Sequence, residues 1–150
     1  MKKTLSDPIE AAEIIDRFKK LQPNSVRLWG TMLLTEMLLH CTLANRFIFE
    51  DNSPYRKPTV AERLRKFACF HIISQLPKNR VGPARLQTFN KAGEDQFEEQ
   101  RKALIISIEK FATHEGPINC LHAALGFLTP IQWGIISWMH MDHHLRQFGA

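Results

Sequence analysis

Apolar side chains recur at intervals of three and four residues in four long stretches of the chain. This spacing places them on one face of an α-helix, so it predicts amphipathic helices. The four predicted helices cover residues 8–21, 31–49, 94–113 and 130 to nearly the end of the chain. No segment alternates between apolar and polar residues for long enough to predict a strand.

Capping residues indicate where several of these helices begin. Asp7 and Thr129 each stand directly before a proline, and an N-cap followed by proline is typical of a helix start. Thr59 and Glu62 form a capping box, which predicts a shorter helix that ends near residue 74. Residues 77–93 contain two prolines and two glycines and are expected to form a loop.

This arrangement of helices predicts an all-α fold. Four long helices with a long connection between the second and the third favour a four-helix bundle, in which the crossover carries the short extra helix. A small globin-like packing of the same helices is the structural alternative. With 150 residues, the chain has the length of one domain, and we expect residues 1–150 to form a single unit.

Composition is typical of a globular protein, with 44% apolar and 23% charged residues. No apolar run approaches the roughly 20 residues of a membrane helix, so we expect no membrane partner. The first residues contain two lysines but no apolar stretch after them, so we expect no secretory signal. Cys41, Cys69 and Cys120 are odd in number and lack C-x-x-C spacing. These features favour a cytoplasmic protein with reduced thiols.

Positive charge is concentrated in the predicted crossover. The chain carries a formal net charge of +5, whereas residues 50–93 alone carry +6. Such a segment is consistent either with a patch for an acidic substrate or nucleic acid, or with a solvated connection. Aromatic residues do not interleave with the charges as they do in a nucleic-acid groove, so the sequence does not favour a nucleic-acid partner.

Three of the seven histidines suggest a metal site. His140 and His144 are four residues apart, which directs both imidazoles to one side of the last helix. His40 lies in the apolar stripe of the second long helix and would face the same interior. Three histidine ligands leave coordination positions open, as in catalytic zinc sites.

Other interpretations of these histidines stay open at this point. A pair with this spacing also arises by chance, and a single core histidine is commonly hydrogen-bonded to a neighbour. His143 is three residues from His140 and could replace His144 in the pair. The remaining histidines have no partner at ligand spacing; they are His71, His114 and His122.

Four segments resemble the DinB-like (damage-inducible) superfamily of bacterial helical-bundle metalloenzymes, in a branch of unknown function. The segments are Leu28-Trp29-Gly30, Glu36-Met37-Leu38-Leu39-His40-Cys41, Leu128-Thr129-Pro130-Ile131-Gln132-Trp133-Gly134 and His140-Met141-Asp142-His143-His144-Leu145-Arg146-Gln147. The resemblance covers nearly the whole chain. It implies a four-helix bundle in up-down-down-up order, a divalent metal ion (most often zinc or nickel) and often a homodimer.

The resemblance also implies a ligand set. The family places one metal-binding histidine on the second helix and two, four residues apart, on the fourth, which gives His40, His140 and His144 and favours His144 over His143. Two features depart from the family pattern. Many relatives continue with Arg-Gly-Gln after the last ligand, where this chain has Leu145-Arg146-Gln147, and many carry a polar helix cap where this chain has Leu33 and Leu34.

These observations lead us to expect a metal-dependent enzyme that acts on a small-molecule substrate, which the resemblance suggests could be a thiol. Activated water would make it a hydrolase, and an activated thiolate would make it a low-molecular-weight thiol transferase. The alternative is a non-enzymatic metal- or ligand-binding protein of a stress response. No catalytic residue is assigned: Glu36 and Asp142 are candidates for a general base or for orienting a ligand, and Cys41 is expected to pack in the core.

Overall fold

Helices make up most of the computed structural model, which describes residues 2–79 and 82–150. The α-helices in these residues are α1 (Pro8–Lys20), α2 (Leu34–Glu50), α3 (Val60–His71), α4 (Phe97–Thr113) and α5 (Pro130–Gln147). Two 3-10 turns, η1 (Ala84–Leu86) and η2 (Glu94–Gln96), lie in the connection before α4. The prediction of a mostly helical chain is confirmed.

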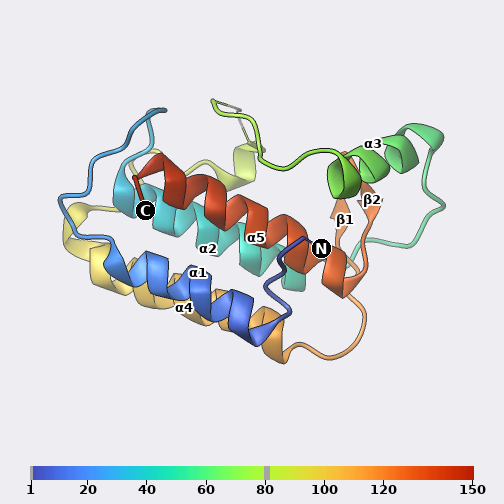
Figure 1. Cartoon of the computed structure of the whole chain (residues 1–150), viewed down its shortest axis with the longest axis horizontal. Coiled ribbons are helices and arrows are strands. Elements are labelled where there is room, and N and C mark those ends of the chain that lie inside the picture. Colours follow the sequence, from blue (N-terminus) through green and yellow to red (C-terminus); the bar gives the residue numbers. More distant parts are fainter. Residues whose placement is uncertain (1, 80–81) are drawn as a thin grey trace.

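The four long helices pack against one another in pairs. α1 contacts α4 and α5, and α2 contacts the same two helices. Figure 1 shows that α1 and α5 run in one direction and that α2 and α4 run in the other. α3 lies apart from them, at one end of the molecule above the short hairpin.

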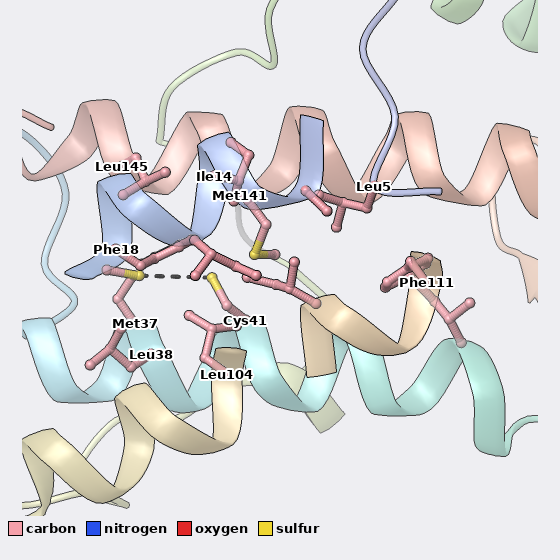
Figure 2. Close-up of a cluster of buried hydrophobic side chains, with 14 of the residues drawn as sticks. Leu5, Ile14, Phe18, Met37, Leu38, Cys41, Leu104, Phe111, Met141 and Leu145 are labelled. Atoms are coloured by element: carbon pink, nitrogen blue, oxygen red, sulfur yellow. Dashed lines mark hydrogen bonds between the residues drawn. The ribbon is translucent and has the colours of Figure 1, made fainter. Parts of the chain in front are cut away.

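A common apolar core forms where the inward faces of these helices meet (Figure 2). Each long helix contributes fully buried side chains at helical spacing, as the sequence pattern predicts. They include Ile14, Phe18, Met37, Leu38, Cys41, Leu104, Ile108, Met141 and Leu145. The Cys41 thiol lies 3.7 Å from the Met37 sulfur, which places it in this core as expected.

Two helices begin later than the sequence predicts. α2 starts at Leu34 instead of residue 31, and the Leu33 side chain has no acceptor with which to cap it. Its backbone N–H donates instead to the Glu36 carboxylate at 2.8 Å, which satisfies one free donor of the first turn. Residues 94–96 form the η2 turn, so α4 begins at Phe97. α3 ends at His71, a few residues before its predicted end.

A small antiparallel hairpin was not predicted. β1 (Leu121–His122) pairs with β2 (Gly126–Phe127), with Leu121 opposite Phe127. Two residues per strand are too few to show a period-two pattern, so the sequence indicated only turns in this region. Within the described residues, no helix is both long and apolar enough to cross a membrane.

The segment before α1 is held against the start of α5. The Leu5 backbone N–H donates to the Gly134 carbonyl at 3.1 Å, and the Leu5 side chain is fully buried. This close approach depends on the missing side chain of Gly134, because a Cβ there would lie 2.6 Å from the Ser6 hydroxyl. Gly134 therefore attaches the N-terminal segment to the helical core.

We expect Gly134→Ala to destabilise the protein by about 1–3 kcal/mol, because the added methyl group must displace the segment that contains Leu5. In a chain of this length that lowers the melting temperature by several degrees. Ile131→Ala, at an exposed position on the same helix, is the control and should change stability by less than about 0.5 kcal/mol. Equal melting temperatures for the two variants would contradict the prediction.

Candidate metal centre

Three histidines from two helices meet in the interior. His40 lies in the middle of α2, and His140 and His144 lie one turn apart on α5. The Nε2 atom of His140 is 3.1 Å from the Nε2 of His40 and also 3.1 Å from the Nε2 of His144. His40 and His144 are buried, and His140 is partly buried. The structure thus brings together the three residues that the sequence singled out as ligands.

Each of the two buried rings is oriented by an acceptor on its far side. His40 Nδ1 lies 2.7 Å from the carbonyl oxygen of Leu86 in η1, and a carbonyl only accepts, so Nδ1–H is the donor. His144 Nδ1 lies 2.8 Å from Gln147 Oε1. The Gln147 amide is fixed in turn because its Nε2 donates to the carbonyl oxygen of Trp29 at 3.0 Å. Both imidazoles therefore direct an unprotonated Nε2 at the centre of the cluster.

In this arrangement the three Nε2 atoms have too few hydrogens to form both of their mutual hydrogen bonds. His140 Nε2 can carry one proton and can donate it to only one of its two neighbours. The Nε2 lone pair of the other neighbour then has no hydrogen to accept in a buried place, which costs free energy unless a cation binds it. Two imidazole nitrogens bound at about 2.0–2.1 Å to one tetrahedral zinc ion lie about 3.3 Å apart, so the donor set fits a divalent metal.

Burial keeps the three rings neutral. It lowers the pKa of His140 well below the usual value of 6.5, and the neighbouring His144 and His40 lower it further. Burial, with a smaller effect of His40, lowers the pKa of His144 to about 3. The pKa of His40 is also lowered by burial, although the hydrogen bond to Leu86 opposes this shift. Neutral imidazole is the form that binds metal.

The two carboxylates considered as a general base have other partners. Glu36 is buried at the start of α2, where its oxygens accept from the backbone N–H groups of Leu33 and Asn90 at 2.8 and 2.7 Å. Asp142 forms ion pairs with Arg17 at 2.9 Å and Arg146 at 2.8 Å. Their hydrogen bonds therefore hold a helix start and a pair of arginines, and neither orients one of the three histidines.

Other candidate side chains lie outside the cluster. His143 is not in the group of three, and its ring lies edge-on to Trp29 and to His144 with centroid distances of 5.9 and 5.2 Å. Cys41 is buried, and burial raises the pKa of its thiol strongly, so it is no thiolate nucleophile. The sequence analysis missed the backbone carbonyls of Leu86, which accepts from the His40 ring, and of Trp29, which accepts from the Gln147 amide. No side-chain pattern in the sequence indicates which distant carbonyl folding brings to a side chain.

Comparison with known proteins identifies a family. A family model matches residues 7–150, which include all three histidines. The chain belongs to the DUF1569 family. The family is described as a protein of unknown function, so DUF1569 membership by itself assigns no activity. No curated protein and no solved structure matches the chain.

We expect Gln147→Met to destabilise this DUF1569 protein by about 1–3 kcal/mol. Methionine has a similar length but leaves the buried Nδ1–H of His144 without an acceptor and removes the donor to Trp29. Urea denaturation measures the change. Gln75→Ala removes an exposed acceptor of Arg146 and should have an effect below about 0.5 kcal/mol. A Gln147→Met variant as stable as the wild type would show that the hydrogen bonds of Gln147 to His144 and Trp29 do not stabilise the fold.

Acid should destabilise the metal-free protein. The unfolded chain protonates His144 near pH 6.5, whereas the folded chain resists protonation until about pH 3. Because the unfolded chain takes up this proton first, the free energy of unfolding is highest above pH 6.5 and falls as the pH is lowered. For His144 alone the loss is about 2 kcal/mol between pH 7 and pH 5. Urea midpoints in the presence of chelator measure it. His144→Gln should flatten the dependence, and equal wild-type midpoints at pH 7 and pH 5 would contradict the prediction.

Proposed function

We propose that this protein is a DinB-like metal-dependent enzyme of the cytoplasm, in which His40, His140 and His144 bind one divalent metal ion, zinc or nickel. The observation that carries the proposal is the convergence of three Nε2 atoms, two of them held with their lone pairs inward by Leu86 and Gln147. The opposed directions of α1 and α5 against α2 and α4 support the up-down-down-up bundle of that superfamily.

Three neutral ligands suit a catalytic site better than a structural one, since structural zinc sites generally have four protein ligands. A divalent ion bound in this way lowers the pKa of a water or thiol at its open positions. Hydrolysis and transfer to or from a low-molecular-weight thiol are the reactions that this chemistry supports. The role of the protein residues is to hold the imidazoles neutral and in a fixed orientation.

A pocket beside the cluster would admit a small substrate. It has a volume of about 500 Å³ and opens along the side of His144 and Gln147. Trp29, Met32 and Phe89 give it apolar walls. Glu36 also lines the pocket, but both of its oxygens already accept backbone hydrogen bonds. The pocket therefore suits a small molecule with an apolar part and gives no free carboxylate to a cationic one.

Metal analysis of the purified protein tests the proposal. We expect close to one zinc or nickel ion per chain in the wild type and almost none in the His140→Ala/His144→Ala variant. Chelation should lower the melting temperature by several degrees, because a ligand of the native state at 100 times its dissociation constant stabilises by about 2.7 kcal/mol. His40→Ala should abolish this shift.

His143→Ala is the matched control, since it removes the neighbouring imidazole from the same helix turn and should keep the metal. Loss of metal in His143→Ala but not in His144→Ala would show that the ligand assignment is wrong. A wild-type protein without metal after growth with added zinc and nickel would overturn the proposal. Screening the loaded protein with small thiols and hydrolysable esters then separates an enzyme from a protein that only binds metal.

A further inference from the structure

α3 is attached to the rest of the protein by both polar and apolar contacts. Lys66 donates to the carbonyl oxygen of Phe127, and Arg65 donates to that of Ala124 at 3.2 Å. Glu62, which is buried, pairs with Arg56 and accepts from the backbone N–H of Thr59. Cys69 is buried in the apolar core, and the partly buried Phe70 packs against that core. The inward face of α3 therefore already has both polar and apolar partners within the protein.

The outward face of α3 is apolar. Val60, Leu64 and Phe67 are 73%, 67% and 59% exposed. Their spacing of four and then three residues places them on one side of the helix, and we call them the α3 stripe. Single exposed apolar residues are ordinary, but a contiguous row on a helix whose opposite face already packs against the protein marks a surface that binds something.

One basic residue borders the α3 stripe. At about 100° per residue, Arg63 lies directly beside it and is exposed, whereas Arg65 lies toward the opposite side of the helix, where it donates to the Ala124 carbonyl. The single acidic residue of the helix, Glu62, is buried and paired. An apolar row of Val, Leu and Phe, with basic residues on the rest of the helix and no free carboxylate, is the pattern of helices that lie in the surface of an anionic membrane.

We infer that α3 docks on an anionic lipid bilayer, with the α3 stripe in the interface and Arg63 at the headgroups. Two observations favour lipid over a second copy of the chain. Pairing two α3 helices would bring like charges together, because α3 carries Arg63, Arg65 and Lys66 and its single carboxylate is already paired with Arg56. The helix also lies at one end of the molecule, apart from the four long helices (Figure 1), so a flat surface can lie along its outward face, which is about 18 Å long.

This inference differs from the sequence-based expectation of no membrane partner. That expectation rested on the lack of an apolar run long enough to span a bilayer, and a helix lying in the interface needs no such run. A row of three apolar side chains spread over residues 60–67 is invisible to a search for long apolar segments.

Flotation with vesicles tests the inference. The full chain is incubated at 50 mM salt with vesicles of 70% phosphatidylcholine and 30% phosphatidylserine, and with vesicles of phosphatidylcholine alone. We expect at least tenfold stronger partitioning to the anionic vesicles, and a loss of about tenfold at 500 mM salt. Phe67→Glu should weaken partitioning about tenfold, and Arg63→Ala should weaken it about threefold.

Ile106→Glu is the matched control, because it places the same charge at a 67% exposed apolar position on α4 and should partition like the wild type. Circular dichroism confirms that each variant is folded. Absence of wild-type partitioning, equal partitioning to neutral vesicles, or unchanged partitioning of Phe67→Glu would each overturn the inference. If the wild type does not partition and sedimentation shows a dimer that Phe67→Glu dissociates, a second copy covers the α3 stripe instead.

Discussion

Burial of three neutral imidazoles around one point is the constraint on which the arrangement of this protein depends. The rings of His40 and His144 each need an acceptor for their Nδ1–H. The acceptor of His40 does not come from α5, and the acceptor of His144 does not come from α2. Leu86 O comes from the crossover, and Gln147 Oε1 is held in place by Trp29 O from the loop before α2. The two long loops are therefore parts of the site, since without them the lone pairs of His40 and His144 would lose their direction.

Hydrogen bonds also attach the crossover to the first half of α2. Beyond the contact of Leu86 with His40, the Thr88 hydroxyl donates to the Glu36 carbonyl and the Asn90 N–H donates to the Glu36 carboxylate. Glu36 also caps its own helix through Leu33, so one carboxylate joins the helix start to the loop. The basic crossover, residues 50–93, is therefore partly fixed beside the histidine cluster by hydrogen bonds. Its charge alone had suggested either a binding patch or a solvated connection.

The sequence predicts best what depends on local spacing. The helices follow from three- and four-residue periodicity and from caps at Asp7, Thr59 and Thr129, and His140 and His144 meet because they are one turn apart. It predicts worse what depends on backbone groups distant in the chain. The acceptors of the imidazoles, the role of Glu36 at Asn90 and the two-residue strands of the hairpin arise only when folding brings separate segments together.

The charge of the cluster decides what kind of ligand it would favour. Asp142 is on the same helix as the two α5 histidines, but Arg17 and Arg146 occupy its oxygens, and the Glu36 carboxylate is held by two backbone donors. No carboxylate in the described residues therefore joins the three imidazoles. A divalent ion bound by neutral ligands alone keeps its full charge in a low-dielectric place, which is costly unless an anion joins it. Hydroxide and thiolate are anions of this kind, so the neutrality of the histidines is itself the physical reason that the two reactions proposed here fit the site.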